Sequence, residues 1–188
     1  MDHITYDKAY ISDILRSVKT IAMVGASTRE VRPSYFVMKY LLDKGYQVIP
    51  INPGVAGGEI LGQKVYASLS DIPMAIDMVD IFRNSSAAGL ITDEALRLDP
   101  LPKVIWMQLS VRNEEAADRA KAKGVKVVMD RCPKIEYGKL SGEWAWVGGA
   151  SSAISSKKQT LHPSGKMQSL GLGPGLGPRM GPGMGIKK

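Results

Sequence analysis

One short loop of the sequence combines hydroxyl groups, guanidinium groups and a glycine. It consists of Gly25, Ala26, Ser27, Thr28, Arg29 and Arg32, and Pro33 and Ser34 follow it. A glycine lets the backbone turn tightly beside a ligand, and arginine matches the geometry of phosphate oxygens. The helical pattern that begins at Pro33 would point its N-terminal amides at the same space. The loop therefore predicts phosphate recognition, and the alternative is a plain strand end with solvated arginines.

The neighbouring residues narrow the type of phosphate ligand. A dinucleotide fingerprint needs glycine at three positions, but after Gly25 the next two positions hold Ser27 and Glu30. The second apolar run ends in Asn52-Pro53 and offers no carboxylate for a ribose hydroxyl. These features disfavour NAD and give NADP only weak support. A nucleotide with a phosphorylated ribose fits better.

The elements that must position this loop are short apolar runs alternating with amphipathic segments. Runs at 21–24, 48–51, 78–82, 104–107 and 125–129 predict strands, and patterns at 12–18, 34–43, 87–98 and 114–123 predict helices. We expect a Rossmann-like, doubly wound α/β domain, with a mainly parallel sheet of five or six strands and helices on both faces. Residues 64–66 predict a small edge strand. Ligands of such sheets bind at the carboxyl ends of the strands.

The motifs at these strand ends occur in a consistent order. They are Gly25-Ala26-Ser27 with Arg32-Pro33-Ser34, then Val48-Ile49-Pro50-Ile51-Asn52-Pro53, Asp77 through Arg83, Trp106-Met107-Gln108 and Asp130-Arg131-Cys132. This series, over about residues 10–140, resembles the single-domain CoA-binding proteins and is similar to the CoA-binding domain of the succinyl-CoA synthetase alpha subunit.

The resemblance implies which residues would hold CoA. Gly25, Ala26, Ser27 and Arg32 would meet phosphates, Asn52 and Pro53 would line the nucleotide end, and Phe82, Arg83 and Asn84 would flank the pantetheine path. Ser110 stands where the family often has glycine, which would narrow the cleft or alter the turn. The synthetases also carry a phosphohistidine on a second domain. His3 and His162 lie outside the predicted fold, so ligase activity is not implied.

Other groups that could do chemistry have structural interpretations. Cys132 adjoins Arg131, and a guanidinium can lower a thiol pKa, although a half-buried structural cysteine is the simpler interpretation. Asp77, Asp80 and Asp130 fit structural hydrogen bonding better than acid–base catalysis. A single cysteine and two histidines give no metal-site pattern.

Composition and charge divide the chain into a body and a tail. The net charge is +7, but the six basic residues after residue 150 have no acidic partner and account for +6. We expect a CoA-binding domain at 1–140, an extension at 141–169 that packs on the body or on a partner subunit, as in a homodimer, and a disordered Gly/Pro-rich basic tail at 170–188. The tail has no aromatic residues for base stacking, which disfavours nucleic acid.

Three function classes remain open from the sequence. The first is a protein that binds CoA or acyl-CoA as a carrier, sensor or regulatory protein, and no catalytic constellation is identified. The second is an enzyme, either an NADP-linked oxidoreductase or a catalyst that handles acyl-CoA. The third is a protein-interaction module with a vestigial nucleotide pocket. The sequence shows no secretory signal pattern and no apolar run of membrane-spanning length, so we expect a cytoplasmic location and no membrane partner.

Overall fold

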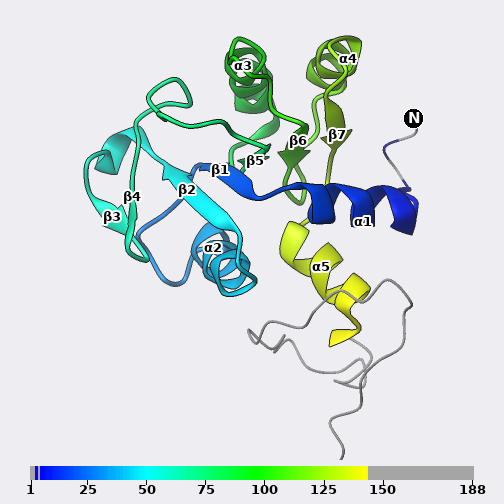
Figure 1. Ribbon diagram of the computed structural model, residues 1–188. Helices are drawn as coiled ribbons and strands as arrows, with labels where there is room; N and C mark the ends of the chain where they lie inside the picture. The colour runs from blue at the N-terminus through cyan, green and yellow to red at the C-terminus, as the bar shows by residue number, and fades with distance from the viewer. Residues whose placement is uncertain (1–2, 4, 144–188) are drawn as a thin grey trace, which may run out of the picture.

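A parallel sheet of five strands forms the middle layer of the protein (Figure 1). The computed structural model describes residue 3 and residues 5–143. The strand order is β2-β1-β5-β6-β7. The strands are β1 (Thr20–Val24), β2 (Gln47–Ile51), β5 (Met78–Ile81), β6 (Val104–Met107) and β7 (Lys126–Val128). All neighbouring pairs are parallel, which confirms the predicted Rossmann-like sheet.

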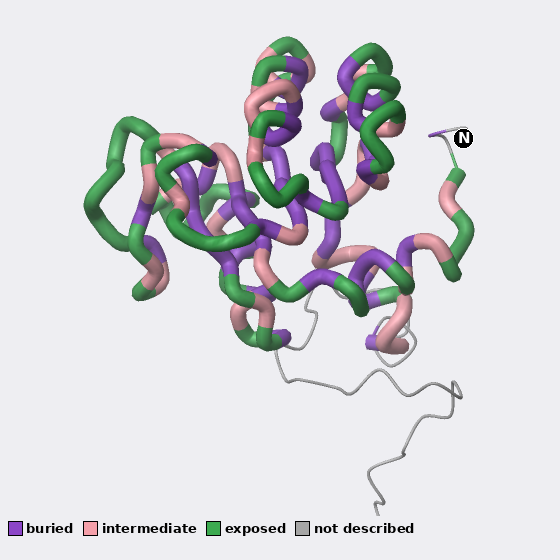
Figure 2. The backbone as a smooth tube through the Cα atoms, turned by 45° about the horizontal axis from the view of Figure 1, so that its top comes forward, coloured by how far each residue is buried: buried purple, intermediate pink, exposed green. Residues whose placement is uncertain are grey.

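Helices cover both faces of the sheet. On one face lie α1 (Lys8–Ser17), α2 (Pro33–Asp43) and α5 (Pro133–Ser141), which share one hydrophobic cluster with the strands. On the other lie α3 (Ser85–Ala95) and α4 (Glu114–Ala122), which share a second cluster. Figure 2 shows the strands buried between the helices, whose outward sides are exposed. Because each strand is buried on both sides, the strands read as continuous apolar runs.

Two features of the strands explain ambiguities in the sequence. Pro50 lies in β2, at the edge of the sheet, where the missing amide hydrogen removes no bond between central strands. Residues 64–66 do not form one strand. Instead β3 (Glu59–Ile60) and β4 (Gln63–Lys64) form a small antiparallel hairpin after the 3₁₀ helix η1 (Pro53–Val55), and Tyr66 makes an isolated bridge to Ile51.

Two predicted helices have other bounds, and one helix was not predicted. The helix predicted at 87–98 is α3, which spans Ser85–Ala95. The first helix begins at Lys8 and not at residue 12, because the Asp7 side chain accepts a hydrogen bond from the Ala9 amide and caps the helix. The helix α5 was not predicted, since its polar residues show almost no amphipathic periodicity.

A buried ion pair holds the end of the α5 segment against α2. Lys44 Nζ lies 2.5 Å from Glu143 Oε1, and both side chains are almost fully buried. The Tyr40 hydroxyl donates to the other carboxylate oxygen of Glu143 at 2.9 Å. Glu143 lies beyond the predicted end of the domain at residue 140, so the packing of the body continues at least to this residue.

Gly25 sets how closely the first loop approaches its neighbour. It follows β1 with φ +91°, a backbone conformation that favours glycine. A Cβ at this position would lie 2.8 Å from the Phe82 carbonyl oxygen and 3.0 Å from Arg83 Cδ. The loops after β1 and β5 are therefore in direct contact.

We expect Gly25→Ala to destabilise the protein by about 1–3 kcal/mol, because the methyl group meets backbone and the residue must keep a positive φ. Urea unfolding of the variant and the wild type measures this difference. Gly57→Ala is the matched control, since Gly57 also has a positive φ but no heavy atom within 4 Å of the added Cβ. Equal losses in both variants would contradict a role for the close contact with Phe82.

Candidate functional site

Backbone and side-chain hydrogen bonds join the first two loops at the carboxyl edge of the sheet. The amides of Gly25 and Ala26 both donate to the Ile51 carbonyl, at 2.9 and 3.3 Å. The side chain of Asn52 bonds both loops. Its Nδ2 donates to the Ala26 carbonyl at 2.8 Å, and its Oδ1 accepts from the Gly54 backbone amide. Gly25, Ala26 and Asn52 thus shape the edge through bonds within the protein, and Pro53 beside them is exposed.

The donors that remain in the first loop lie further along it. Among the described residues, the backbone amides of Ser27 and Thr28 have no hydrogen-bond acceptor within the protein. The Ser27 hydroxyl accepts from the Arg29 amide at 3.1 Å. Next, α2 begins at Pro33 after Arg32, with no side-chain cap on its N-terminus. Backbone amides and the positive end of the helix dipole therefore face the same space, which favours an anion.

Three arginines belong to the loops at this edge of the sheet. Arg29, Arg32 and Arg83 are exposed, and none of them makes an ion pair with a described residue. Arg83 belongs to the loop after β5, and its Cδ lies against Gly25. Ser34, the second residue of α2, is buried beneath the loop. The predicted residues of the first and third loops are therefore brought together.

The remaining predicted residues have identifiable structural contacts. Phe82 is half-buried, packs against the core and donates its amide to the Val24 carbonyl at 2.8 Å. Asn84 caps α3, because its side-chain oxygen accepts from the Ala87 amide at 2.9 Å. The Asn84 side chain is thus occupied as a helix cap, whereas Phe82 leaves part of its ring at the edge.

A buried polar pair that the sequence did not identify as a site lies just below the edge. Asp80 is fully buried in β5, and Gln108 follows β6 with only 5% of its surface exposed. Gln108 Nε2 donates to both carboxylate oxygens of Asp80, at 2.9 and 3.2 Å. Burial raises the pKa of Asp80 to about 7, although the Gln108 amide acts in the opposite direction. Their positions at the ends of adjacent strands were the signal in the sequence.

Asp77 and Asp130, the other candidate acids, hold the backbone. Asp77 accepts hydrogen bonds from the amides of Lys19 and Thr20 and pairs with Lys103, all at the amino edge of the sheet. Burial works to raise the pKa of Asp77, but these donors outweigh it and the pKa is lowered. Asp130 accepts from the Ser110 amide at 2.7 Å. Neither carboxylate lies beside the predicted phosphate loop in a way that suggests proton transfer.

Cys132 has the environment of a structural thiol. Its side chain is 5% exposed, and burial raises its pKa to about 11. The thiol is therefore protonated at neutral pH, which contradicts activation by Arg131. The guanidinium of Arg131 instead stacks over the Tyr6 ring, 5.5 Å from its centroid.

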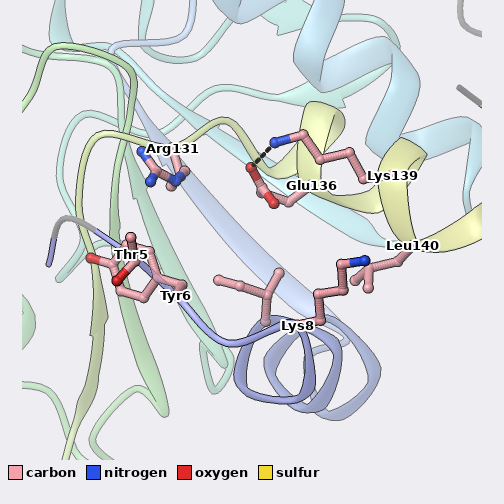
Figure 3. A pocket seen from close by; sticks show the side chains of 8 residues that line it. Thr5, Tyr6, Lys8, Arg131, Glu136, Lys139 and Leu140 are labelled. Carbon is pink, nitrogen blue, oxygen red and sulfur yellow. Dashed lines mark hydrogen bonds and ion pairs between the residues drawn. The ribbon is translucent and has the colours of Figure 1, made fainter. Parts of the chain in front are cut away.

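A cavity of about 390 Å³ lies between the N-terminal segment, α1 and α5 (Figure 3). Its lining includes three basic side chains, Lys8, Arg131 and Lys139, and one acidic side chain, Glu136, which pairs with Lys139 at 2.9 Å. None of the residues that the sequence predicted for CoA lines it. The cavity is therefore separate from the three loops.

Ser110, which stands where the family often has glycine, adopts a backbone conformation that favours glycine. Its φ is 64°, in the left-handed region. The departure from glycine thus strains the turn after β6 and leaves the fold unchanged.

We expect Ser110→Gly to stabilise the protein by about 0.5–1 kcal/mol, because glycine adopts this φ without strain. Chemical denaturation monitored by circular dichroism tests this. A loss of stability would show that the Ser110 side chain contributes more than its backbone strain costs.

The buried Asp80 makes stability depend on pH. Its pKa is raised in the folded protein, so between about pH 4 and 7 the folded state holds a proton that the unfolded chain releases. The free energy of unfolding should therefore decrease as pH rises through this range. Asp80→Asn should remove about 2 kcal/mol of this decrease between pH 5 and 8. Urea unfolding at both pH values measures it, with exposed Asp118→Asn as control. Parallel pH profiles of wild type and Asp80→Asn would contradict the prediction.

Membrane-spanning helices and metal-binding clusters are absent from the described residues. No helix there combines the length and the apolar content that a membrane crossing requires. No group of three or more His, Cys, Asp or Glu side chains gathers there in a way that could hold a metal ion.

Known proteins with this architecture include uncharacterised relatives. The chain is 42% identical over 130 residues to the uncharacterized protein YneT of Bacillus subtilis, which covers 69% of this chain and 93% of that protein. A solved protein from Thermus thermophilus is 35% identical with a TM-score of 0.67, over 71% of this chain and 98% of the other. A hypothetical protein from Pyrococcus horikoshii is 38% identical with a TM-score of 0.67, over 72% and 92%.

The similarity to an enzyme covers a smaller part of both chains than the similarity to these relatives does. The chain is 38% identical over 76 residues to the acetate–CoA ligase (ADP-forming) of Methanocaldococcus jannaschii, which is 40% of this chain but only 10% of the ligase. The sequence profile of the CoA binding domain matches residues 19–138, from the start of β1 to the middle of α5. This match and the shared architecture show that the chain belongs to the family of CoA-binding domains.

Proposed function

We propose that this protein binds CoA across the loops that follow β1, β2 and β5, with the phosphorylated ADP end at the first loop. The observation that carries the proposal is the group of three exposed arginines, none of which makes an ion pair with a described residue, on the loops next to the uncapped N-terminus of α2. The amides of Ser27 and Thr28 add donors. CoA carries a diphosphate and a 3′-phosphate, so it needs several cationic and amide donors at once.

The end of β2 favours CoA over NAD and NADP. Asn52 occupies the position where a dinucleotide-binding protein needs an acid for the ribose, and its side chain is already bonded to Ala26 and Gly54. The exposed Pro53 next to it offers an apolar surface for the nucleotide end. A 3′-phosphorylated ribose needs arginines and no acid, which matches the residues present.

The pantetheine arm would pass between the loops that follow β5 and β6. Phe82 gives an apolar wall, and Arg83 and the capping residue Asn84 flank it. The backbone amide of Gln108 donates to the Ile81 carbonyl at 3.3 Å, which puts Gln108 on the other side of this path. An arm with two amides and an apolar chain suits such a mixed lining.

The acids described above serve structural hydrogen bonds, and this favours a carrier, sensor or regulatory role in the cytoplasm over catalysis. Acyl-CoA would use the same phosphate contacts as free CoA, since it differs only at the thiol end. The enzymatic alternatives are an NADP-linked oxidoreductase and an enzyme that handles acyl-CoA. The remaining alternative is a protein-interaction module with a vestigial nucleotide pocket.

We expect CoA to bind at least about tenfold more tightly than dephospho-CoA, because the 3′-phosphate makes charge-assisted hydrogen bonds with arginine. Arg29→Gln, Arg32→Gln and Arg83→Gln should each weaken CoA binding about five- to twentyfold. For the arginine that holds the 3′-phosphate, dephospho-CoA binding should not change. Isothermal titration calorimetry with CoA, dephospho-CoA, NADP and NAD measures these affinities.

Arg16→Gln is the matched control, because Arg16 is exposed in the last turn of α1, away from the three loops. It should leave CoA affinity unchanged. Preference for NADP would favour the oxidoreductase, and binding of none of the four ligands would favour the vestigial pocket. Either result would overturn the proposal.

A further inference from the structure

A carboxylate without a cation lies under the middle of the proposed cleft. Asp80 belongs to β5, the central strand, and pairs in register with Met23 on β1 and Trp106 on β6. Its side chain is fully buried, and no described Lys, Arg or His forms an ion pair with it. Gln108 Nε2 is its hydrogen-bond donor. Since a buried charge without a cation is costly, this arrangement needs a reason.

The other end of the Gln108 amide reaches solvent. In the described chain, the buried side-chain oxygen and nitrogen atoms without a hydrogen bond are His3 Nε2 and Thr92 Oγ1. Gln108 Oε1 has no hydrogen bond within the protein and is not among these buried atoms. With Nε2 turned inward to Asp80, Oε1 is therefore the atom that Gln108 presents at the carboxyl edge, beside the Ile81–Phe82 backbone.

The protonation state of Asp80 determines whether Gln108 Oε1 is available as an acceptor at the carboxyl edge. An ionised carboxylate only accepts hydrogen bonds, so it keeps Nε2 inward and leaves Oε1 as an acceptor for the cleft. A protonated carboxyl can also donate its O–H to Oε1, while its other oxygen accepts from Nε2. The amide and the carboxyl then form a closed pair, and the acceptor is withdrawn from the cleft. One proton thus changes the hydrogen-bonding character of the edge.

We propose that Asp80 is a positioning residue which, through Gln108, makes recognition of the pantetheine arm depend on one buried proton. The inference rests on the proposed function. In the ionised state Gln108 Oε1 accepts a hydrogen bond from a donor of the arm, an amide N–H or the thiol. In the neutral state that hydrogen bond is lost, and the contacts to the nucleotide end remain.

The groups around Asp80 leave it as the titrating residue near neutral pH. On the face of the sheet that Asp80 occupies, burial raises the pKa of Cys132 to about 11. Burial also raises the pKa values of the tyrosines on the three helices of this face, which are Tyr10 on α1, Tyr40 on α2 and Tyr137 on α5. Lys134 on α5 acts on Cys132, and Lys44 is paired with Glu143. Tyr6 and Tyr46 also have raised pKa values, whereas burial lowers that of His3. The pKa of Asp80, about 7, supports a change in this range.

The test compares CoA with adenosine 3′,5′-bisphosphate, which shares the 3′-phosphorylated nucleoside but lacks the arm. Calorimetry at pH 5.5 and pH 8 gives the dissociation constants of both ligands. The preference for CoA is the dissociation constant of the bisphosphate divided by that of CoA. In the wild type this ratio should rise about five- to tenfold at the higher pH, the value of one hydrogen bond. Asp80→Asn should keep the low ratio at both pH values, because asparagine forms the closed amide pair permanently. Gln108→Met should also keep the low ratio.

Exposed Asp118→Asn is the matched control and should behave as the wild type. Titration of the ligands themselves is the same for every variant, so the difference between wild type and Asp80→Asn isolates the buried proton. Acetyl-CoA, which has no thiol hydrogen, identifies the donor. A persistent pH effect assigns an amide of the arm, and its loss assigns the thiol.

Two results would overturn the inference, and they are distinguishable from each other. If the wild type binds both ligands but its ratio changes with pH no more than the ratios of Asp80→Asn and Gln108→Met do, the proposed function stands and the role of Asp80 is wrong. If the wild type binds neither ligand, the proposed function fails and the inference fails with it. Gln108→Met retains Asp80 and removes only the side-chain amide, so it provides the same comparison if Asp80→Asn has a folding defect.

Discussion

The architecture depends on the pairing of β1 with a strand on each side, β2 and β5. Because all three strands are parallel, their carboxyl ends emerge at one edge, and the loops after them meet there. The Ile51 carbonyl, at the end of β2, binds two consecutive amides of the first loop. This contact uses donors that a phosphate could otherwise have had. The Ser27 and Thr28 amides, further along the loop, have no acceptor among the described residues.

The two edges of the sheet use acidic side chains differently. At the amino edge, Asp77 is partly exposed and surrounded by donors, so its charge is stabilised. Near the carboxyl edge, Asp80 is fully buried with one amide as donor, so its charge is destabilised. The two residues are three positions apart in one segment. Because the strand runs from the amino edge to the carboxyl edge, the two carboxylates have different surroundings although they belong to one segment.

The sequence predicted the sheet well, because a strand buried on both faces leaves an unmistakable apolar run. The sequence also located the loop with its arginines at this edge of the sheet, since each motif follows such a run, and the binding of phosphate there stays a prediction. The use of the Gly25, Ala26 and Asn52 groups within the protein could not be predicted, because these contacts join residues about 26 positions apart. The helix α5 was missed because its buried residues, Pro133, Tyr137 and Gly138, do not form an apolar stripe. Residues 144–169 of the predicted extension and the predicted tail at 170–188 lie outside the described residues.

The ion pair between Lys44 and Glu143 has a consequence for how the protein can be handled. Lys44 lies at the C-terminal end of α2, just before β2 begins, and therefore on the amino side of the sheet. Glu143 is fixed to it, so the described chain ends on the side opposite the three loops. A surface or fluorophore attached at Gly142, where α5 ends, would be held on the side of the body opposite the three loops. The proposed mouth would then face the solution, in an orientation suited to immobilised binding assays.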